Sequence, residues 1–166
     1  MLFGGKSGEH EVSLKSAASV IANLDRAKYE VLPVKISREG KCLPPEFVAH
    51  LVSLKPPFDV VFPVLHGPYG EDGTVQGFLE LAGVPFVGSD TLASALAMDK
   101  LMAKKIFLAD GIPTPKYWFF RAGDEPDALC ISFPYVVKPM NSGSSVGISI
   151  VLQEGEFQEA WKKELE

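Results

Sequence analysis

The sequence of 166 residues has little cysteine, no long apolar segment and no excess of positive charge. Its two cysteines, Cys42 and Cys130, are too few for a disulfide framework or a zinc ribbon, so we expect reduced thiols and a cytoplasmic protein. No apolar run approaches the roughly 18 residues of a membrane span, and the first residues lack the features of a signal peptide. We therefore expect no membrane partner.

Acidic residues outnumber basic ones by 21 to 16, which gives a formal net charge of −5. A chain with this charge lacks the positive field that attracts nucleic acid, so we expect no nucleic-acid partner. Hydrophobic residues make up 46%, enough to form a core, which argues against intrinsic disorder. Glycine and proline are abundant, with 15 and 13 residues, and they indicate tight turns or loops whose backbone approaches a ligand.

The first 97 residues alternate between strand-like and helical segments. Strands are predicted at 2–3, 30–36, 60–65 and 84–87, and helices at 12–24, 74–81 and 91–97, with a polar connection at 40–57 that has room for a short helix at 47–54. This alternation predicts an α/β domain with an open, mostly parallel, Rossmann-like sheet. Pro63 cannot donate to a ladder, which counts against a central position for its strand.

The pattern changes after residue 97. Asp99 can cap a helix that runs to about residue 110, where Gly111 and Pro113 would end it. Strands are then predicted at 116–121, 135–138 and 146–152, and a charged helix at 157–166. Two strands joined by a short Gly/Ser loop predict an antiparallel hairpin. We therefore divide the chain into an α/β domain, 1–97, and the beginning of an α+β domain, 98–166.

Two polar segments follow predicted strands of the first domain. Residues 4–11, Gly-Gly-Lys-Ser-Gly-Glu-His-Glu, match neither GxGxxG nor GxxxxGK[ST], so the usual nucleotide motifs are excluded here. Glu9 and Glu11 fall at the carboxyl edge of the sheet, where ligands bind, and suit a substrate ammonium; alternatively, they only complement a helix dipole. His66 opens the second segment, 66–77, among three glycines and two acids, which favours a functional role over a purely structural one.

Two lysines of the second domain stand at unusual positions. Lys100 begins a helix, where the dipole prefers anions, so a bound phosphate would explain it; alternatively, it is an ordinary solvated lysine. Lys138 ends an apolar strand and precedes a loop with Gly143, Ser144 and Ser145, whose N–H groups and hydroxyls can face phosphate oxygens. The alternative for this loop is a flexible hairpin tip.

Taken in order, these segments resemble the N-terminal part of the D-alanine–D-alanine ligases of the ATP-grasp superfamily. The matching segments are Gly4-Gly5-x-Ser7-x-Glu9-x-Glu11-Val12-Ser13-Leu14, His66-Gly67-x-x-Gly70-Glu71-Asp72-Gly73-x-Val75-Gln76-Gly77, Met98-Asp99-Lys100, and Val137-Lys138-Pro139 through Gly143-Ser144-Ser145-Val146-Gly147. The resemblance spans essentially the whole chain. It implies a pre-ATP-grasp domain at 1–97 followed by a truncated ATP-grasp domain at 98–166.

The resemblance also implies a reaction. ATP would phosphorylate one D-alanine, and the amine of a second would attack the acyl phosphate to give a dipeptide for peptidoglycan synthesis. Glu9 would pair with the ammonium of the first D-alanine, His66 would hold its carboxylate end, and Ser144 would join the substrate network, which makes Glu9 and Ser144 the catalytic candidates. The nucleotide would be bound by Lys100, Lys138, Gly143, Ser144 and Ser145. A homodimer is expected by the same resemblance.

The chain ends before several parts of the family pattern, among them the Mg²⁺ ligands, which we expect beyond residue 166. By itself the 166-residue chain is therefore expected to lack ligase activity. Two other interpretations stay open: a D-alanine–D-lactate ligase on the same scaffold, and a non-catalytic module that binds a nucleotide or an amino acid.

Overall fold

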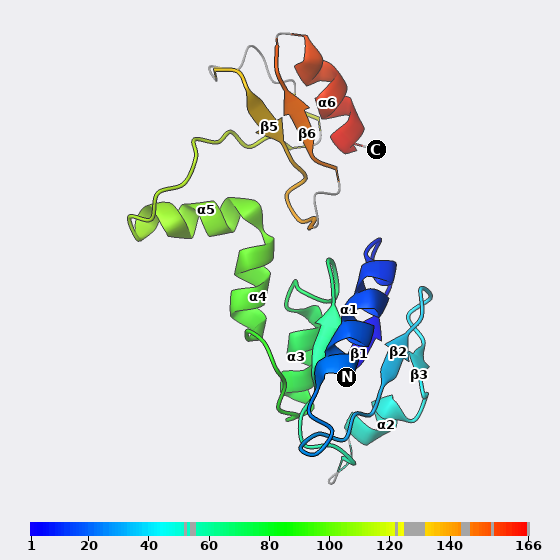
Figure 1. Ribbon diagram of the computed structural model, residues 1–166. Coiled ribbons are helices and arrows are strands. Elements are labelled where there is room, and N and C mark those ends of the chain that lie inside the picture. Colours follow the sequence, from blue (N-terminus) through cyan, green and yellow to red (C-terminus); the bar gives the residue numbers. More distant parts are fainter. Residues whose placement is uncertain are drawn as a thin grey trace. The chain divides into compact units, whose positions relative to one another are not determined.

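The structure is a computed structural model that describes residues 1–51, 53, 56–121, 123–124, 132–143, 147–153 and 155–165. The chain forms two compact units, Met1–Met98 and Asp99–Glu166. The element order along the chain is shown in Figure 1. Within the described residues no helix is long and apolar enough to cross a bilayer.

The first unit is built on a four-stranded, mostly parallel sheet, as the alternating pattern predicts. The strands are β1 (Leu2–Gly4), β2 (Val34–Ile36), β3 (Cys42–Leu43) and β4 (Pro63–Leu65), in the spatial order β3-β2-β1-β4. β1 pairs in parallel with both β2 and β4, so its carboxyl end lies between theirs. β3 pairs antiparallel with β2 and is missing from the sequence prediction.

The predicted strand at 30–36 is too long, because only Val34–Ile36 forms a strand. The register pairs Leu2 with Val34 and Gly4 with Ile36, so β1 offers ladder partners to three residues of this segment. Just before them, the amino group of Met1 donates to the carbonyl of Leu32 at 2.7 Å.

Three helices, α1 (His10–Asn23), α2 (Phe47–Leu51) and α3 (Thr74–Leu81), cover the sheet and close its core. A fourth helix, α4 (Thr91–Met98), packs on α3. α1 packs on β1 and β4 (Figure 1) through small residues: Ser13 and Ala17 are buried, and Ser13 Oγ accepts from Gly4 N–H and donates to the carbonyl of Val64. The apolar core joins the sheet to α2 and α3 and comprises Leu2, Val34, Phe47, Leu51, Val61, Leu65, Val75, Leu79 and Val84.

The predicted strand at 84–87 is reduced to a single parallel bridge between Val61 and Phe86. Val61 N–H donates to the carbonyl of Pro85, and Val87 N–H donates to the carbonyl of Val61, both at 2.9 Å. The next donor in this parallel ladder would come from residue 63, which is proline and has no N–H. Pro63 thus ends the pairing, and β4 is the last strand of the four-stranded sheet.

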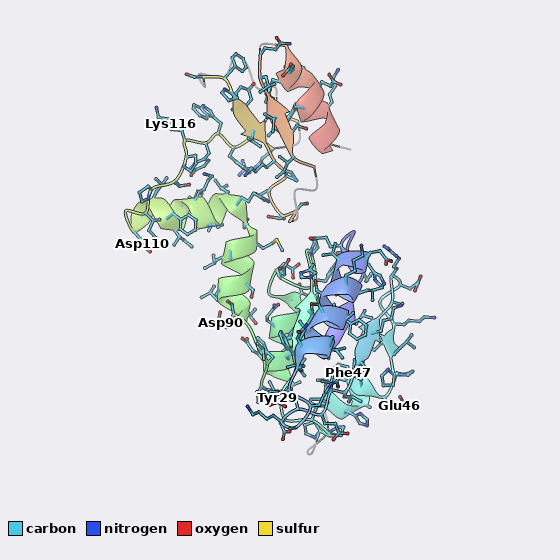
Figure 2. The ribbon with its side chains drawn as sticks, in the orientation of Figure 1. Tyr29, Glu46, Phe47, Asp90, Asp110 and Lys116 are labelled. Carbon is cyan, nitrogen blue, oxygen red and sulfur yellow. The ribbon has the colours of Figure 1, made fainter. Side chains whose placement is uncertain are left out.

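In each unit an aspartate caps the beginning of a helix. Asp90 Oδ1 accepts from Ala93 N–H at 2.7 Å, and Figure 2 shows Asp90 where α4 begins. Asp99 Oδ1 accepts from Leu101 N–H and Met102 N–H, each at 2.9 Å, and opens α5 (Lys100–Ala109). The cap at Asp99 agrees with the sequence prediction, because a carboxylate at this position satisfies N–H groups that the helix leaves unpaired.

The second unit contains an antiparallel hairpin, as predicted, formed by β5 (Tyr135–Val137) and β6 (Ser149–Val151), with α6 (Glu156–Leu165) packed on both strands. The predicted strand at 116–121 is wrong, since these residues form no ladder. Instead the ring of Phe120 packs on Phe157 and Trp161 of α6, at centroid distances of 6.4 and 5.8 Å. Burial of an aromatic side chain against a helix accounts for the apolar pattern that suggested a strand.

Candidate functional site

The turn that follows β1 brings α1 toward the end of β4. Gly4 and Gly5 both have positive φ, 90° and 95°, and a Cβ at Gly4 would lie 2.3 Å from the carbonyl oxygen of Ile36. Ser7 Oγ then donates to the carbonyl of His66 at 2.7 Å and accepts from Glu9 N–H at 3.2 Å. The hydrogen bonds of Ser7 therefore link the carboxyl ends of β1 and β4 beside Glu9, at the sheet edge where the parallel topology predicts a site.

Glu9 is the most informative side chain of this edge. The residue is 6% exposed, and among the described residues its Oε1 has no hydrogen-bond partner. Its other oxygen faces Gly67, where a Cβ would come within 2.1 Å of Oε2. Although Glu9 occupies the N-cap of α1, its side chain makes no capping hydrogen bond. The carboxylate is thus held in a buried position where one oxygen still lacks a donor.

Glu11 has different surroundings from Glu9. It lies in the first turn of α1, is exposed, and its Oε1 is 3.0 Å from Nη2 of Arg38. An acidic side chain in this turn suits the positive end of the helix dipole. The dipole explanation therefore describes Glu11 well, whereas the carboxylate of Glu9 is turned inward.

His66 follows β4 and lies between α1 and the glycine-rich loop. Its Nε2 is 3.0 Å from Ser16 Oγ on α1, and its Nδ1 is 3.9 Å from Oε1 of Glu71. The other oxygen of Glu71 accepts from Gly67 N–H at 2.7 Å. The side chain of Glu71 therefore points toward His66 rather than toward the start of α3, and its hydrogen bond to Gly67 stabilises the loop.

Asp72 also stabilises this loop through hydrogen bonds to its backbone. Its oxygens accept from Tyr69 N–H at 2.9 Å and from Thr74 N–H at 3.0 Å. Burial favours the neutral acid, but these hydrogen bonds outweigh burial and lower the pKa of Asp72 below its ordinary value. The carboxylate thus stays ionised at neutral pH and supports the beginning of α3.

A small cavity of about 280 Å³ adjoins this edge of the sheet. It is lined by the turn after β1, the segment 65–70 and the start of α3, with Gly40 of the β2–β3 turn. Lys6 Nζ lies 5.6 Å from the ring centroid of Tyr69, and Tyr69 itself has a positive φ of 68°. Lys6 and Tyr69 are lining residues that the sequence analysis did not select, because each occupies a variable position within its motif.

Lys100 and the loop after β5 are joined within the second unit. Lys100 Nζ donates to the carbonyls of Ser142 and Met140, at 2.5 and 3.3 Å. Lys138 directly follows β5 and is exposed, and Gly143 is half-buried. The predicted phosphate ligands Ser144 and Ser145 lie outside the described residues. Lys100 thus binds the backbone at the beginning of the loop, unlike a lysine whose ammonium group contacts only solvent.

Lys104 is a further cation of this region that the sequence analysis missed. It lies one helical turn after Lys100, and its Nζ donates to Thr114 Oγ1 at 2.8 Å and to the carbonyl of Pro115 at 3.1 Å. Burial, and then the positive charge of Lys138, lower the pKa of Lys104. The i, i+4 spacing of Lys100 and Lys104 on α5 is the signal that could have found it.

Metal ligands are not gathered in the part of the chain that the structure describes, where no cluster of three or more His, Cys, Asp or Glu side chains could hold an ion. The described residues therefore do not offer a Mg²⁺ site. Lys138, just after β5, lies near enough to Lys104 of α5 for its positive charge to contribute to the lowered pKa of Lys104.

Family models and known proteins match the chain along most of its length. Residues 1–55 and 48–89 match the model "D-ala D-ala ligase N-terminus", and residues 106–166 match "D-ala D-ala ligase C-terminus". The D-alanine–D-alanine ligase of Deinococcus radiodurans is 46% identical over 176 residues, covering 91% of this chain and 52% of that protein. The ligase of Geobacter sulfurreducens is 46% identical over 162 residues, covering 96% and 48%.

Solved structures give the same result. The D-alanine–D-alanine ligase of Coxiella burnetii superposes with a TM-score of 0.86 at 31% identity, over 99% of this chain and 59% of that one. The ligase of Bacillus anthracis complexed with ATP gives 0.78 at 35% identity, over 97% and 52%. The VanG D-Ala:D-Ser ligase of Enterococcus faecalis gives 0.77 at 34% identity, over 99% and 58%.

The chain spans about half the length of the curated relatives it matches. The family models cover the sheet edge with Glu9 and His66, and they cover Lys138, whereas Lys100 and Lys104 lie between the two matched ranges. With both family models and relatives above 40% identity in agreement, this chain belongs to the D-alanine–D-alanine ligase family.

Proposed function

We propose that this chain is the substrate- and phosphate-binding part of an ATP-dependent ligase that joins two D-alanines for peptidoglycan synthesis. The first unit would bind the first D-alanine, with Glu9 on its ammonium and His66 on its carboxylate end. The second unit would bind ATP phosphates with Lys100, Lys138 and the loop 143–147. An acyl phosphate of the first D-alanine would then be attacked by the amine of the second.

The buried carboxylate of Glu9 is the single observation that carries this proposal. A buried polar atom without a partner costs about 1–3 kcal/mol, and more when it is charged. Oε1 of Glu9 is such an atom among the described residues, held by a helix start and a glycine that allows its close approach. A ligand ammonium would supply the missing donor and the opposite charge.

The lysines of the second unit support the nucleotide part of the proposal. Phosphoryl transfer between anions needs fixed positive charge and preorganised donors. Lys138 and Lys104 place two cations near each other, and a phosphate group would relieve their repulsion. Lys100 would keep the start of the loop in place through its carbonyl contacts, while Ser144 and Ser145 would supply hydroxyls. ATP is thus a ligand that these residues suit.

A ligase with a different second substrate is the other candidate. It is favoured by the likeness to VanG, which is described as a D-Ala:D-Ser ligase. A D-alanine–D-lactate ligase belongs to the same class. All three would share the first D-alanine and therefore the proposed role of Glu9, so the choice of second substrate does not bear on the site described in the first unit.

An activity assay of two polypeptides tests the proposed function. A full-length protein that carries this sequence is expected to release phosphate from ATP in the presence of Mg²⁺ and D-alanine and to form D-alanyl-D-alanine. The 166-residue chain by itself is expected to release none, because its described residues offer no metal site. Supplying D-serine or D-lactate with D-alanine identifies the second substrate. The proposal would be contradicted if the full-length protein formed no product with D-alanine alone or with added D-serine or D-lactate.

A further inference from the structure

We propose that Ser16 is a positioning residue for His66, whose ring it holds in one orientation and in one tautomer. Ser16 lies in α1, two residues beyond the first matching segment, and it is half-buried. The inference deepens the proposed function, because the substrate role of His66 rests on that function. The effect of Ser16 on the ring, however, can be measured without any substrate.

The ring of His66 is bracketed by two groups from different elements. Ser16 Oγ lies 3.0 Å from Nε2, within hydrogen-bond distance, whereas Oε1 of Glu71 lies 3.9 Å from Nδ1. The backbone of His66 is fixed as well, since its carbonyl accepts from Ser7 Oγ at 2.7 Å. Rotation of the side chain is therefore the remaining freedom, and among the described residues Ser16 provides the one polar contact of the ring at hydrogen-bond distance.

The carboxylate of Glu71 and the hydroxyl of Ser16 face opposite nitrogens of the His66 ring, and together they favour one tautomer. Glu71 is itself held by the N–H of Gly67 at 2.7 Å, so its carboxylate stays beside Nδ1. A carboxylate favours a proton on the nearer nitrogen, and a neutral imidazole with hydrogen on Nδ1 has an acceptor at Nε2. The hydroxyl of Ser16 must then be the donor of the 3.0 Å hydrogen bond to Nε2.

The position of Ser16 along α1 ties His66 to Glu9. Seven residues separate Ser16 from Glu9, which is about two helical turns, so both lie on the same side of the helix. Ser13, between them, is buried and donates to the carbonyl of Val64 in β4. One rigid helix thus sets the position of the Glu9 carboxylate and the orientation of the His66 ring. Nδ1–H, at 3.9 Å from Glu71, stays available to a ligand carboxylate oxygen.

Nitrogen-15 NMR of the 166-residue chain, labelled in histidine, tests the tautomer at about pH 8, where free histidine is neutral. In the unsubstituted chain His66 is expected to show a protonated Nδ1 and an unprotonated Nε2. Ser16→Ala is expected to shift the ring toward the Nε2–H tautomer that free histidine prefers. His10, whose Nδ1 lies 2.7 Å from the carbonyl of Gly5, provides an internal reference that should not change.

Two matched variants distinguish the effect of the Ser16 hydroxyl group from the effect of side-chain size. Threonine and valine have nearly the same size, but only threonine has a hydroxyl. Ser16→Thr is therefore expected to keep the tautomer of His66, and Ser16→Val is expected to lose it. Ser19→Ala, at an exposed position of the same helix, is expected to leave the His66 signals unchanged. Identical nitrogen-15 shifts of His66 in the Thr and Val variants would overturn the proposal.

In the full-length enzyme, Ser16→Val is expected to raise the KM for the first D-alanine about tenfold relative to Ser16→Thr, the amount that one lost hydrogen bond accounts for. The kcat is expected to change less than twofold. A KM ratio near one between the two variants would contradict the positioning role. Absence of ligase activity in the unsubstituted enzyme would instead overturn the proposed function and leave the NMR result standing.

Discussion

Replacing Glu9 by glutamine in the full-length enzyme is expected to raise the KM for the first D-alanine by at least about 100-fold. Removing one partner of a buried ion pair costs about 3–5 kcal/mol, and each 1.4 kcal/mol is a factor of ten in affinity. The stability of the 166-residue chain is expected to stay the same or to rise, because the substitution removes a buried charge whose Oε1 has no partner among the described residues. Steady-state kinetics and urea unfolding measure the two effects.

Glu11→Gln is the matched control for this substitution. Glu11 is two residues away in the same helix, but it is exposed and paired with Arg38, which is also exposed. Surface ion pairs of this kind contribute little, so the KM for D-alanine is expected to remain within twofold. A Glu9→Gln enzyme that behaved like Glu11→Gln would show that the buried carboxylate does not bind the substrate ammonium.

Gly4→Ala is expected to destabilise the 166-residue chain by about 3 kcal/mol, from a positive φ and a steric clash together. The added Cβ would lie 2.3 Å from the carbonyl oxygen of Ile36 and 3.1 Å from Cε1 of His10. That carbonyl accepts from Gly5 N–H at 2.9 Å, so β2 cannot move away without weakening this contact. Urea denaturation followed by circular dichroism gives the change in the free energy of unfolding.

Gly83→Ala separates backbone strain from the steric clash. Gly83 has a positive φ of 67°, yet a Cβ there would meet no atom within 4 Å. Its substitution is expected to cost about 1 kcal/mol, from the left-handed backbone alone. Equal destabilisation by the two substitutions would mean that the approach of Gly4 to β2 contributes nothing to the cost, contrary to the packing described for this turn.

The elements with strong local signals could be predicted closely from the sequence. Residues 74–81 have helical periodicity and a glycine beyond each end, and α3 has these same bounds. The short strand β3 could not be predicted, because Cys42 and Leu43 are held by pairing with β2 rather than by a pattern of their own. The prediction for the segment 116–121 failed for the opposite reason. Phe120 packs on α6, and no local pattern distinguishes this contact from burial in a strand.

The candidate site was predictable where topology alone sets it. Parallel strands bring their carboxyl ends to one edge, so a Glu after β1 and a His after β4 had to approach each other. Ser16 and Lys104 were not predictable in this way, since each gains its role from a tertiary contact. Ser16 is one of several serines on α1, and only the orientation of the His66 ring distinguishes it. The spacing of Lys104 from Lys100 is visible in the sequence, but its proximity to Lys138 is a tertiary contact.

A crystal structure of the full-length enzyme with D-alanine bound tests the central claim most directly. The claim predicts the amino nitrogen of the first D-alanine at about 2.7–3.2 Å from Oε1 of Glu9, with its carboxylate toward His66. In that complex the oxygen that lacks a partner among the described residues would accept its hydrogen bond from the ligand. A D-alanine whose amino group pairs with another carboxylate, while Oε1 of Glu9 stays without a donor, would contradict the claim.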